Sequence, residues 1–340
     1  MARFGLMMGG KSVDEHVELS QEAEALGFGT VWLGEGRLTG SVIPHMTAVL
    51  RETRSIRVGS GILPYRTRNV GILAGTFKTF DEFAPGRAVM GLGPWWEPLA
   101  SRLGLPNTKP LKAMREVITV SKELLAGRTV TFHGEFVDVT DIRFDSPHDD
   151  FGRTYDVPIY VGAVRFGMVA LAGEIADGVL LDFLLPPSYT VEAWEALRTG
   201  AARSGRALDD FGVPQLIACS VDDDDPQKAI DECKYFLTQY VAQQSHITEF
   251  SGADPELVAA VKAKVGWPAT SAQIRDAMTL LSNAFVQSVC ACGTTSQAVD
   301  KIDEFVEAGV TEAVLTPQTP GLGALETIRR IGRHTTSVGV

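Results

Sequence analysis

Two glycine-rich strand ends in the first third of the chain could hold a flat cofactor. One reads IRVGSGILPYRTRNV over Ile56–Val70, and the other reads GRAVMGLGPWWE over Gly86–Glu97. Each begins as a short apolar run typical of a strand and then breaks at glycine and proline. Because glycine has no Cβ, a planar ring can lie close to the backbone at such an end. We therefore expect a cofactor floor here, with Gly93 as part of it.

Several side chains at strand ends could take part in chemistry on that floor. Glu35 follows an apolar strand between two glycines, and burial could raise its carboxyl pKa so that it donates or accepts a proton. Glu97 follows two tryptophans, an apolar wall that would raise its pKa in the same way. Either acid could instead be a solvated loop residue, and the tryptophans could stack on a substrate or simply pack. The shortlist is Met7, Glu35, Tyr65, Trp95, Trp96, Glu97 and Asp182, with Glu35 and Glu97 as acids and Met7, Tyr65, Trp95 and Trp96 as substrate contacts.

The sequence does not indicate a metal site. The four cysteines form no CxxC pair, and the CAC segment at 290–292 is more typical of buried apolar residues on a strand. The six histidines show no zinc or iron spacing. Asp222–Asp225 is more typical of a solvated loop whose acids favour the next helix N-terminus. Arg66 and Arg68 could meet an anionic cofactor tail, but pairing with surface acids is favoured.

These residues must be positioned by alternating strands and helices. The expected strands are Arg3–Met7, Thr30–Leu33, Ile56–Gly59, Ala88–Leu92, Ile159–Gly162, Gly178–Leu181, Gln215–Val221 and Ala313–Thr316. Eight strands with intervening helices predict an α/β fold, a (β/α)8 TIM barrel, with a doubly wound sheet as the alternative. We expect one domain over 1–340, with a hairpin excursion near 129–145 and a helical insertion near 226–285. A Rossmann site is disfavoured because GxGxxG is absent after the first strand.

Charge and hydropathy limit the partners. The 340-residue chain has a formal net charge of −11, which argues against nucleic acid and anionic membranes as general partners. No apolar stretch reaches the roughly 18 residues of a membrane span, and the N-terminus is too short and too soon charged for a signal peptide. We expect a reduced, cytoplasmic protein that acts on a small molecule.

The chain resembles the bacterial luciferase-like superfamily, and within it the coenzyme F420-dependent branch typified by methylenetetrahydromethanopterin reductase. The resemblance covers nearly the whole chain. It rests on RFGL, ALGFGTVWLGE, VGSGILPYRTRNV, GRAVMGLGP, FHGEFV, VPIYVGAVRFGMVALAGEIADGVLL and EAGVTEAVLTP, in that order. It implies a luciferase-like (β/α)8 barrel with insertion segments and a homodimer.

The resemblance also places the cofactor. It implies that strand three ends in a non-prolyl cis peptide under the cofactor ring, and the matching bond is Gly61–Ile62. It places the cofactor phosphodiester on Gly162, Ala163, Val164 and Arg165 and on the helix that Gly167 opens. Free N–H groups at a helix start attract phosphate, and Arg165 adds a fork of donors.

The chain departs from the family where substrates bind. The methylene-pterin reductases carry a glutamate at the end of strand one, where this chain has Met7. Related dehydrogenases carry a histidine after strand two, where this chain has Gly34-Glu35-Gly36-Arg37. Substrate assignments therefore do not transfer.

The expected activity is F420-dependent hydride transfer between the deazaflavin C5 and an imine, an enone or a pterin-like double bond, with no metal. The alternatives are an FMN-dependent monooxygenase that uses O2 and a non-catalytic F420-binding protein.

Overall fold

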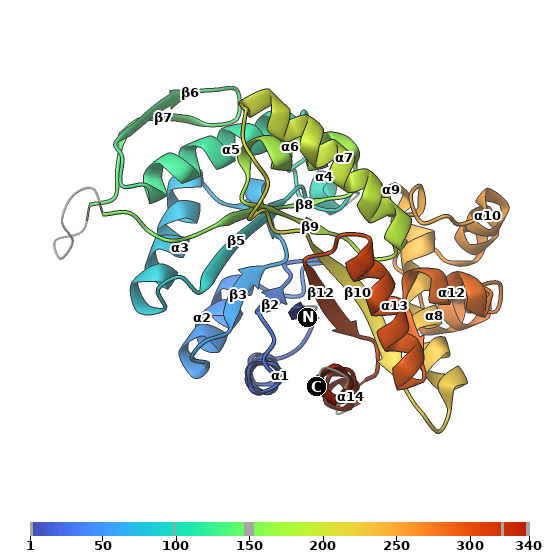
Figure 1. Cartoon of the computed structure of the whole chain (residues 1–340). Helices are drawn as coiled ribbons and strands as arrows, with labels where there is room; N and C mark the ends of the chain where they lie inside the picture. Colours follow the sequence, from blue (N-terminus) through green and yellow to red (C-terminus); the bar gives the residue numbers. More distant parts are fainter. Residues whose placement is uncertain (1–2, 98, 146–152, 321–322, 338–340) are drawn as a thin grey trace.

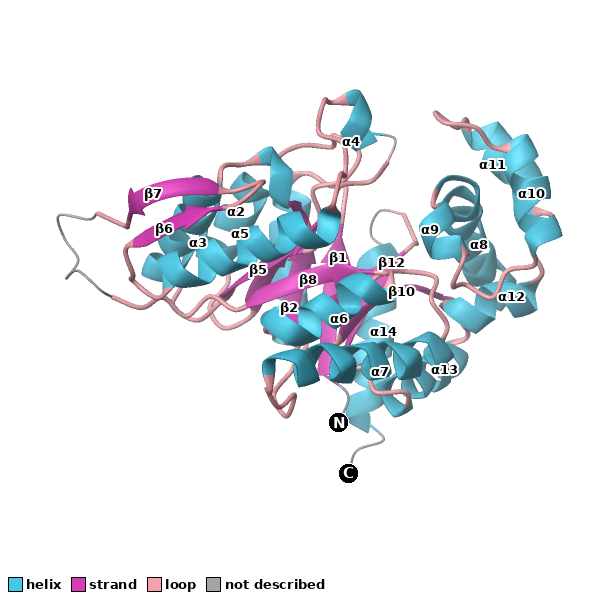
Figure 2. Cartoon of the chain, turned by 90° about the horizontal axis from the view of Figure 1, so that it is seen from above, coloured by secondary structure: helices cyan, strands magenta, loops and turns pink. Residues whose placement is uncertain are grey.

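Eight parallel strands close into a barrel that helices surround (Figure 1, Figure 2). The computed structural model describes residues 3–97, 99–145, 153–320 and 323–337. The barrel strands are β1 (Arg3–Met8), β2 (Thr30–Leu33), β3 (Arg57–Ser60), β5 (Ala88–Gly93), β8 (Ile159–Ala163), β9 (Gly178–Leu181), β10 (Pro214–Val221) and β12 (Glu312–Pro317). β12 pairs with β1 and β10, and Gln215 of β10 pairs with Leu181 of β9 to close the ring. The predicted barrel is confirmed, and the doubly wound alternative, which would leave the sheet open, is wrong.

Helices cover the outside of the barrel. They are α1 (Val13–Ala25), α2 (Val42–Glu52), α3 (Val70–Phe83), α5 (Pro110–Leu125), α6 (Phe166–Ile175), α7 (Pro187–Ser204), α13 (Thr295–Glu307) and α14 (Gly323–Ser337). A capping box starts α1, because Ser12 and Glu15 exchange side-chain to backbone hydrogen bonds. α7 begins at Pro187, since the first turn of a helix does not need the N–H that proline lacks.

Two aromatic side chains, Trp32 and Tyr160, fill the barrel interior, with ring centroids 5.5 Å apart. The neighbouring positions must be glycine. A Cβ on Gly59 would lie 2.6 Å from the Trp32 ring, and a Cβ on Gly178 would lie 2.2 Å from the Tyr160 ring. The interior is therefore packed, and a ligand must bind at the strand ends.

Two segments depart from the barrel pattern and lie on opposite sides of it (Figure 1, Figure 2). The hairpin β6 (Val130–His133) and β7 (Asp138–Ile142) has its turn held by the Glu116 carboxylate, which accepts from three successive N–H groups of residues 135–137. The helical segment comprises α8 (Pro226–Gln243), α9 (Ser245–Thr248), α10 (Pro255–Lys264), α11 (Ser271–Met278) and α12 (Asn283–Val289), followed by β11 (Ala291–Gly293). Short elements at strand ends are β4 (Leu63–Pro64), the 3-10 helix η1 (Tyr65–Thr67) and α4 (Leu99–Arg102).

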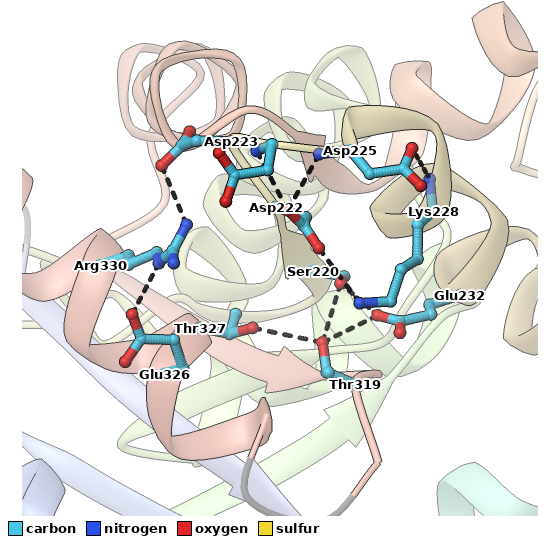
Figure 3. A network of polar contacts seen from close by, with 11 residues as sticks. Ser220, Asp222, Asp223, Asp225, Lys228, Glu232, Thr319, Glu326, Thr327 and Arg330 are labelled. Carbon is cyan, nitrogen blue, oxygen red and sulfur yellow. Dashed lines mark hydrogen bonds and ion pairs between the residues drawn. The ribbon is translucent and has the colours of Figure 1, made fainter.

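The acidic run Asp222–Asp225 organises the loop between β10 and α8 (Figure 3). Asp225 accepts from the backbone N–H of Lys228 and so caps α8. Asp222 accepts from the two N–H groups of residues 224 and 225 and pairs with Lys228 Nζ at 3.1 Å. Asp223 binds the first residue of α13 and an arginine of α14. Three of the four acids thus hold the loop, as the loop interpretation predicts.

Candidate active site

A cavity of about 1000 Å³ opens at the carboxyl ends of the barrel strands, which is where barrel enzymes carry their active sites. Its walls come from the ends of β1, β2, β5, β8, β9 and β12, and from α8 and α9. The helical segment therefore forms one wall, and the barrel strands form the floor. A cavity of this size, largely apolar with a few polar groups, is typical of a cofactor or ligand site.

Ile62 forms part of the floor. It follows a cis peptide bond between Gly61 and Ile62, so the cis bond expected from the resemblance is confirmed. Its side chain lies between two glycines: a Cβ on Gly93 would lie 2.7 Å from Ile62 Cγ1, and a Cβ on Gly162 would lie 2.5 Å from Ile62 Cγ2. These two glycines therefore make room for an isoleucine, a role that the sequence does not reveal.

The start of α6 presents backbone donors to the cavity. Arg165 is the N-cap residue, and Gly167 lies in the first turn. N–H groups of a first turn have no acceptor within the helix and attract anions. The Arg165 side chain is 62% exposed and pairs with Glu249 at 2.9 Å. An exposed pair of this kind is worth little, so the guanidinium can turn to a ligand at small cost.

Two of the acids in the cavity wall are engaged by other groups. The Glu35 carboxylate accepts from both terminal nitrogens of Arg68, the shortest contact being 3.0 Å, and from the backbone N–H of Val42. Glu97 accepts from the backbone N–H groups of Ser101 and Asn107. Arg68 thus has an acid partner, as the sequence favours, although the pair lies at the cavity and not on the outer surface.

The expectation of a raised pKa for Glu97 is wrong. Burial raises the pKa of this carboxyl, but hydrogen bonds from Ser101 and Asn107 stabilise the charged form more strongly, and the net pKa lies below its usual range. The tryptophans before it do not enclose it, and its side chain is exposed. Glu97 is therefore a loop-organising carboxylate in this structure.

The third acid, Asp182, follows β9 and lines the cavity. One carboxylate oxygen accepts from the N–H of Phe183 at 2.8 Å. Burial raises the pKa of Asp182 from 3.8 to about 6, and this hydrogen bond opposes the shift. Asp182 is one of the seven strand-end residues that the sequence places near the cofactor. It differs from Glu35 and Glu97 in its partners, because only one backbone N–H binds its carboxylate among the described residues.

An arginine–tryptophan contact joins two barrel loops to the helical segment. The Arg37 guanidinium lies 4.9 Å from the centroid of the Trp96 ring and donates to Gln243 Oε1 at 2.9 Å. Trp96 Nε1 donates to the carbonyl of Gln243 at 3.4 Å, and the Trp96 ring meets Trp267 edge-on. Arg37 and Trp96 thus connect the loops after β2 and β5 to the end of α8 beside the cavity.

Three buried polar atoms at the cavity have no hydrogen-bond partner within the described residues. They are the indole Nε1 of Trp95, Oε1 of Gln244 and Oγ1 of Thr316. A buried polar atom without a partner costs about 1–3 kcal/mol. A ligand that carries both hydrogen-bond donors and acceptors would relieve that cost.

Most of the predicted site residues meet at this cavity. Those that line it are Met7, Glu35, Ile62, Trp95, Trp96, Glu97, Gly162, Ala163, Val164, Arg165 and Gly167. Gly61, Gly93 and Tyr65 are not among the lining residues, and the Tyr65 hydroxyl accepts from Arg66 Nε. Sequence reasoning missed Thr316, which the strand-end rule could have found, and Gln244, which no sequence pattern marks.

Across the described ranges, no three or more histidine, cysteine, aspartate or glutamate side chains are arranged to hold a metal ion. His148 lies outside those ranges. Within the same ranges, no helix combines the length and the apolar character needed to cross a bilayer.

Comparisons with known proteins agree with this geometry. A sequence model of the family described as luciferase-like monooxygenase matches residues 1–312. A 5,10-methylenetetrahydromethanopterin reductase of Methanolobus tindarius is 31% identical over 294 residues, 86% of each chain. An F420-dependent glucose-6-phosphate dehydrogenase of Nakamurella multipartita is 32% identical over 65% of this chain and 68% of its own. The solved coenzyme F420-dependent tetrahydromethanopterin reductase from Methanopyrus kandleri superposes with a TM-score of 0.85 and 27% identity, covering 98% of this chain and 99% of its own.

Proposed function

The chain belongs to the luciferase-like monooxygenase family, and from this premise we propose that it is an F420-dependent oxidoreductase. It transfers a hydride between the deazaflavin of coenzyme F420 and a small organic substrate. The observation that carries the proposal is similarity to F420-dependent enzymes over most of the chain, by sequence and by structure. The match to a monooxygenase family by name supports the fold and does not by itself favour an oxygen-using reaction.

The cavity fits such a cofactor. The Gly61–Ile62 segment and the glycine-flanked Ile62 side chain give a floor for a planar ring. The α6 N-terminus with Arg165 suits the phosphodiester. The unpartnered atoms of Trp95, Gln244 and Thr316 suit a ligand rich in polar groups.

When bound, the deazaflavin supplies a carbon that gives up or accepts a hydride. The residues of the chain position the cofactor and the substrate and form the walls around them. Ile62, with Gly93 and Gly162 beside it, forms the floor. The contact of Arg37 with Trp96 holds the loops after β2 and β5 together beside the end of α8. Glu35 is paired with Arg68 and so holds the β2 loop.

The substrate is proposed to be a small electrophile, such as an imine, an enone or a pterin-like C=N or C=C compound. Met7, Trp95 and Trp96 line the cavity and are the proposed contacts. Met7 leaves the end of β1 without a carboxylate, so this wall favours an apolar part of the substrate. A homodimer in the cytoplasm completes the proposal.

Turnover tests the reaction class. Reduced F420 would be mixed with the protein and a panel of imines, enones and pterins, and reoxidation would be followed by absorbance. An oxygen electrode with reduced FMN is the parallel assay. We expect F420 reoxidation with a panel member and no FMN-dependent oxygen uptake. Sustained oxygen uptake with reduced FMN and no F420 turnover would show a monooxygenase instead.

A further inference from the structure

We infer that Asp182 is the residue of the cavity that holds a proton and delivers it to the bound substrate. This inference rests on the proposed function for its hydride donor. The placement of Asp182, and the lack of a counter-ion for it among the described residues, are independent of that function.

Asp182 lines the same cavity as the floor residue Ile62. A Cβ on Gly61 would lie 3.3 Å from Leu180 Cδ2, so Leu180 of β9 packs against the floor segment. Side chains two residues apart on a strand point to the same face, and both Leu180 and Asp182 line the cavity. Asp182 directly follows the last residue of β9, so its carboxyl group is part of the cavity wall at the end of the strand that carries Leu180.

The partners of the three acids in the cavity wall differ. Glu35 has the Arg68 guanidinium, and Glu97 has two backbone N–H groups. Among the described hydrogen bonds and ion pairs, Asp182 has only the N–H of Phe183. Asp182 is half-buried, and a carboxylate that loses much of its contact with water and has no cation beside it tends to bind a proton.

The surroundings of Asp182 are aromatic. The Phe183 ring contacts Phe236 and Tyr240 of α8, with centroids 5.4 and 5.7 Å away. The charge of Asp182 acts on two tyrosines, Tyr189 of α7 and Tyr240 of α8. Burial first, and then this charge, raise the pKa of both phenols, so both remain neutral hydroxyl groups. The other charged or titratable residues lining the cavity are Lys11, Glu35, Arg37, Glu97, Arg165 and His246.

The proton step balances as follows. The bound deazaflavin would supply the hydride. When the carbon of a C=N group or the β-carbon of an enone accepts it, the π electrons of the substrate would move to the heteroatom. The heteroatom takes the proton of the Asp182 carboxyl group, so an O–H bond breaks and an N–H or O–H bond forms. Asp182 remains as a carboxylate until it takes a proton from water entering the cavity.

The first arm of the test needs no cofactor. Infrared difference spectra of the free protein between pH 4.5 and 8 would be compared for wild type and Asp182→Asn. Asp210→Asn, which alters an exposed acid between α7 and β10, is the matched control. We expect a protonated carboxyl band in wild type that titrates near pH 6 and is missing only in Asp182→Asn. Identical spectra for wild type and Asp182→Asn would overturn the inference.

The second arm adds oxidised F420 at pH 7 and measures proton uptake with an indicator dye. A ligand that displaces water from Asp182 raises its proton affinity, so wild type should take up at least about half a proton more than Asp182→Asn. Equal uptake by the two proteins would show that Asp182 does not hold a proton beneath the ligand. If F420 binds neither protein, the proposed function fails, while the infrared arm still decides whether Asp182 is the proton-holding residue.

Discussion

At the scale of single residues, the three acids of the cavity show how partners decide chemistry. Glu35 and Glu97 have the better sequence context for proton transfer, yet a guanidinium holds one and two backbone N–H groups hold the other. Those partners lie up to 33 residues away in the sequence and are brought near only by the fold. Within the described structure, Asp182 accepts only from the N–H of Phe183, and that could not be predicted from the residues around it.

Arg165 gives the first residue-scale prediction. Its pair with Glu249 is exposed, and a charge-assisted hydrogen bond to a phosphate would be worth about 1.5–3 kcal/mol. Arg165→Ala should therefore weaken F420 binding by roughly ten- to a hundred-fold, as measured by absorbance titration. Arg198→Ala, which removes another exposed arginine, should bind like wild type. If Arg165→Ala binds F420 normally at both low and high salt, Arg165 is not a phosphate ligand.

A pair of histidines between α1 and α2 makes stability depend on pH. His16 Nδ1 lies 2.7 Å from His45 Nδ1, and His16 is only 5% exposed. Burial first, and then the charges of His45 and Lys11, lower the pKa of His16 from 6.5 to about 4. Between pH 4 and pH 6.5, His16 therefore binds more protons in the unfolded chain than in the folded chain. The contribution of neutral His16 to the free energy of unfolding is complete above pH 6.5 and is lost as the pH falls towards 4.

Urea unfolding at pH 7.5 and pH 5 measures this effect. Wild type should lose stability on acidification, and His16→Gln should lose about 1–2 kcal/mol less, since each pKa unit is worth 1.36 kcal/mol. His133→Gln, at an exposed site in the hairpin, should show the wild-type difference. Equal pH dependence in wild type and His16→Gln would show that the folded protein does not keep His16 neutral.

At the scale of elements, local signals predicted much of the fold. The capping box at Ser12 and the order of strands and helices could be read directly because both depend on neighbouring residues. The cavity wall contributed by α8 and α9 could not be read, because Gln244 reaches the site only through packing of the helical segment. The role of Gly162 was likewise hidden, since it depends on Ile62, which lies on another strand end.

Substitution by alanine tests which of two glycines, Gly162 at the end of β8 or Gly167 at the start of α6, lacks space for a side chain. In Gly162→Ala the new Cβ would lie 2.5 Å from Ile62 Cγ2, whereas in Gly167→Ala the nearest atom, Leu111 Cδ1, is 3.6 Å away. Overpacking costs about 1–3 kcal/mol, so Gly162→Ala should lower the free energy of unfolding and weaken F420 binding. Gly167→Ala should fold with wild-type stability. Equal stability of the two variants in urea titrations would contradict the described floor.

The four cysteines come together where α8 meets β10 and β11, an association that the sequence did not reveal. Cys219, Cys233, Cys290 and Cys292 are all buried as free thiols, and burial raises the pKa of the Cys219 and Cys233 thiols. Thiolates are the reactive form, so a thiol reagent such as DTNB should label fewer than one cysteine per native chain and about four in denaturant. Rapid labelling of the native protein would show that this packed region opens.

At the scale of the whole molecule, closure of the barrel brings residues from Leu6 to Ala324 around one cavity. The formal net charge of −11 describes the surface as a whole. Locally, Lys11, Arg37 and Arg165 lie at the cavity and give it cationic groups suited to an anionic cofactor. Global composition therefore argues against nucleic acid as a general partner but could not describe the site.

The central claim is that this cavity binds coenzyme F420 in preference to FMN. Equilibrium titration of the purified protein with each cofactor, followed by absorbance, tests it most directly. The account predicts saturable F420 binding at micromolar or lower concentration and weaker FMN binding. Micromolar FMN binding without detectable F420 binding would contradict it.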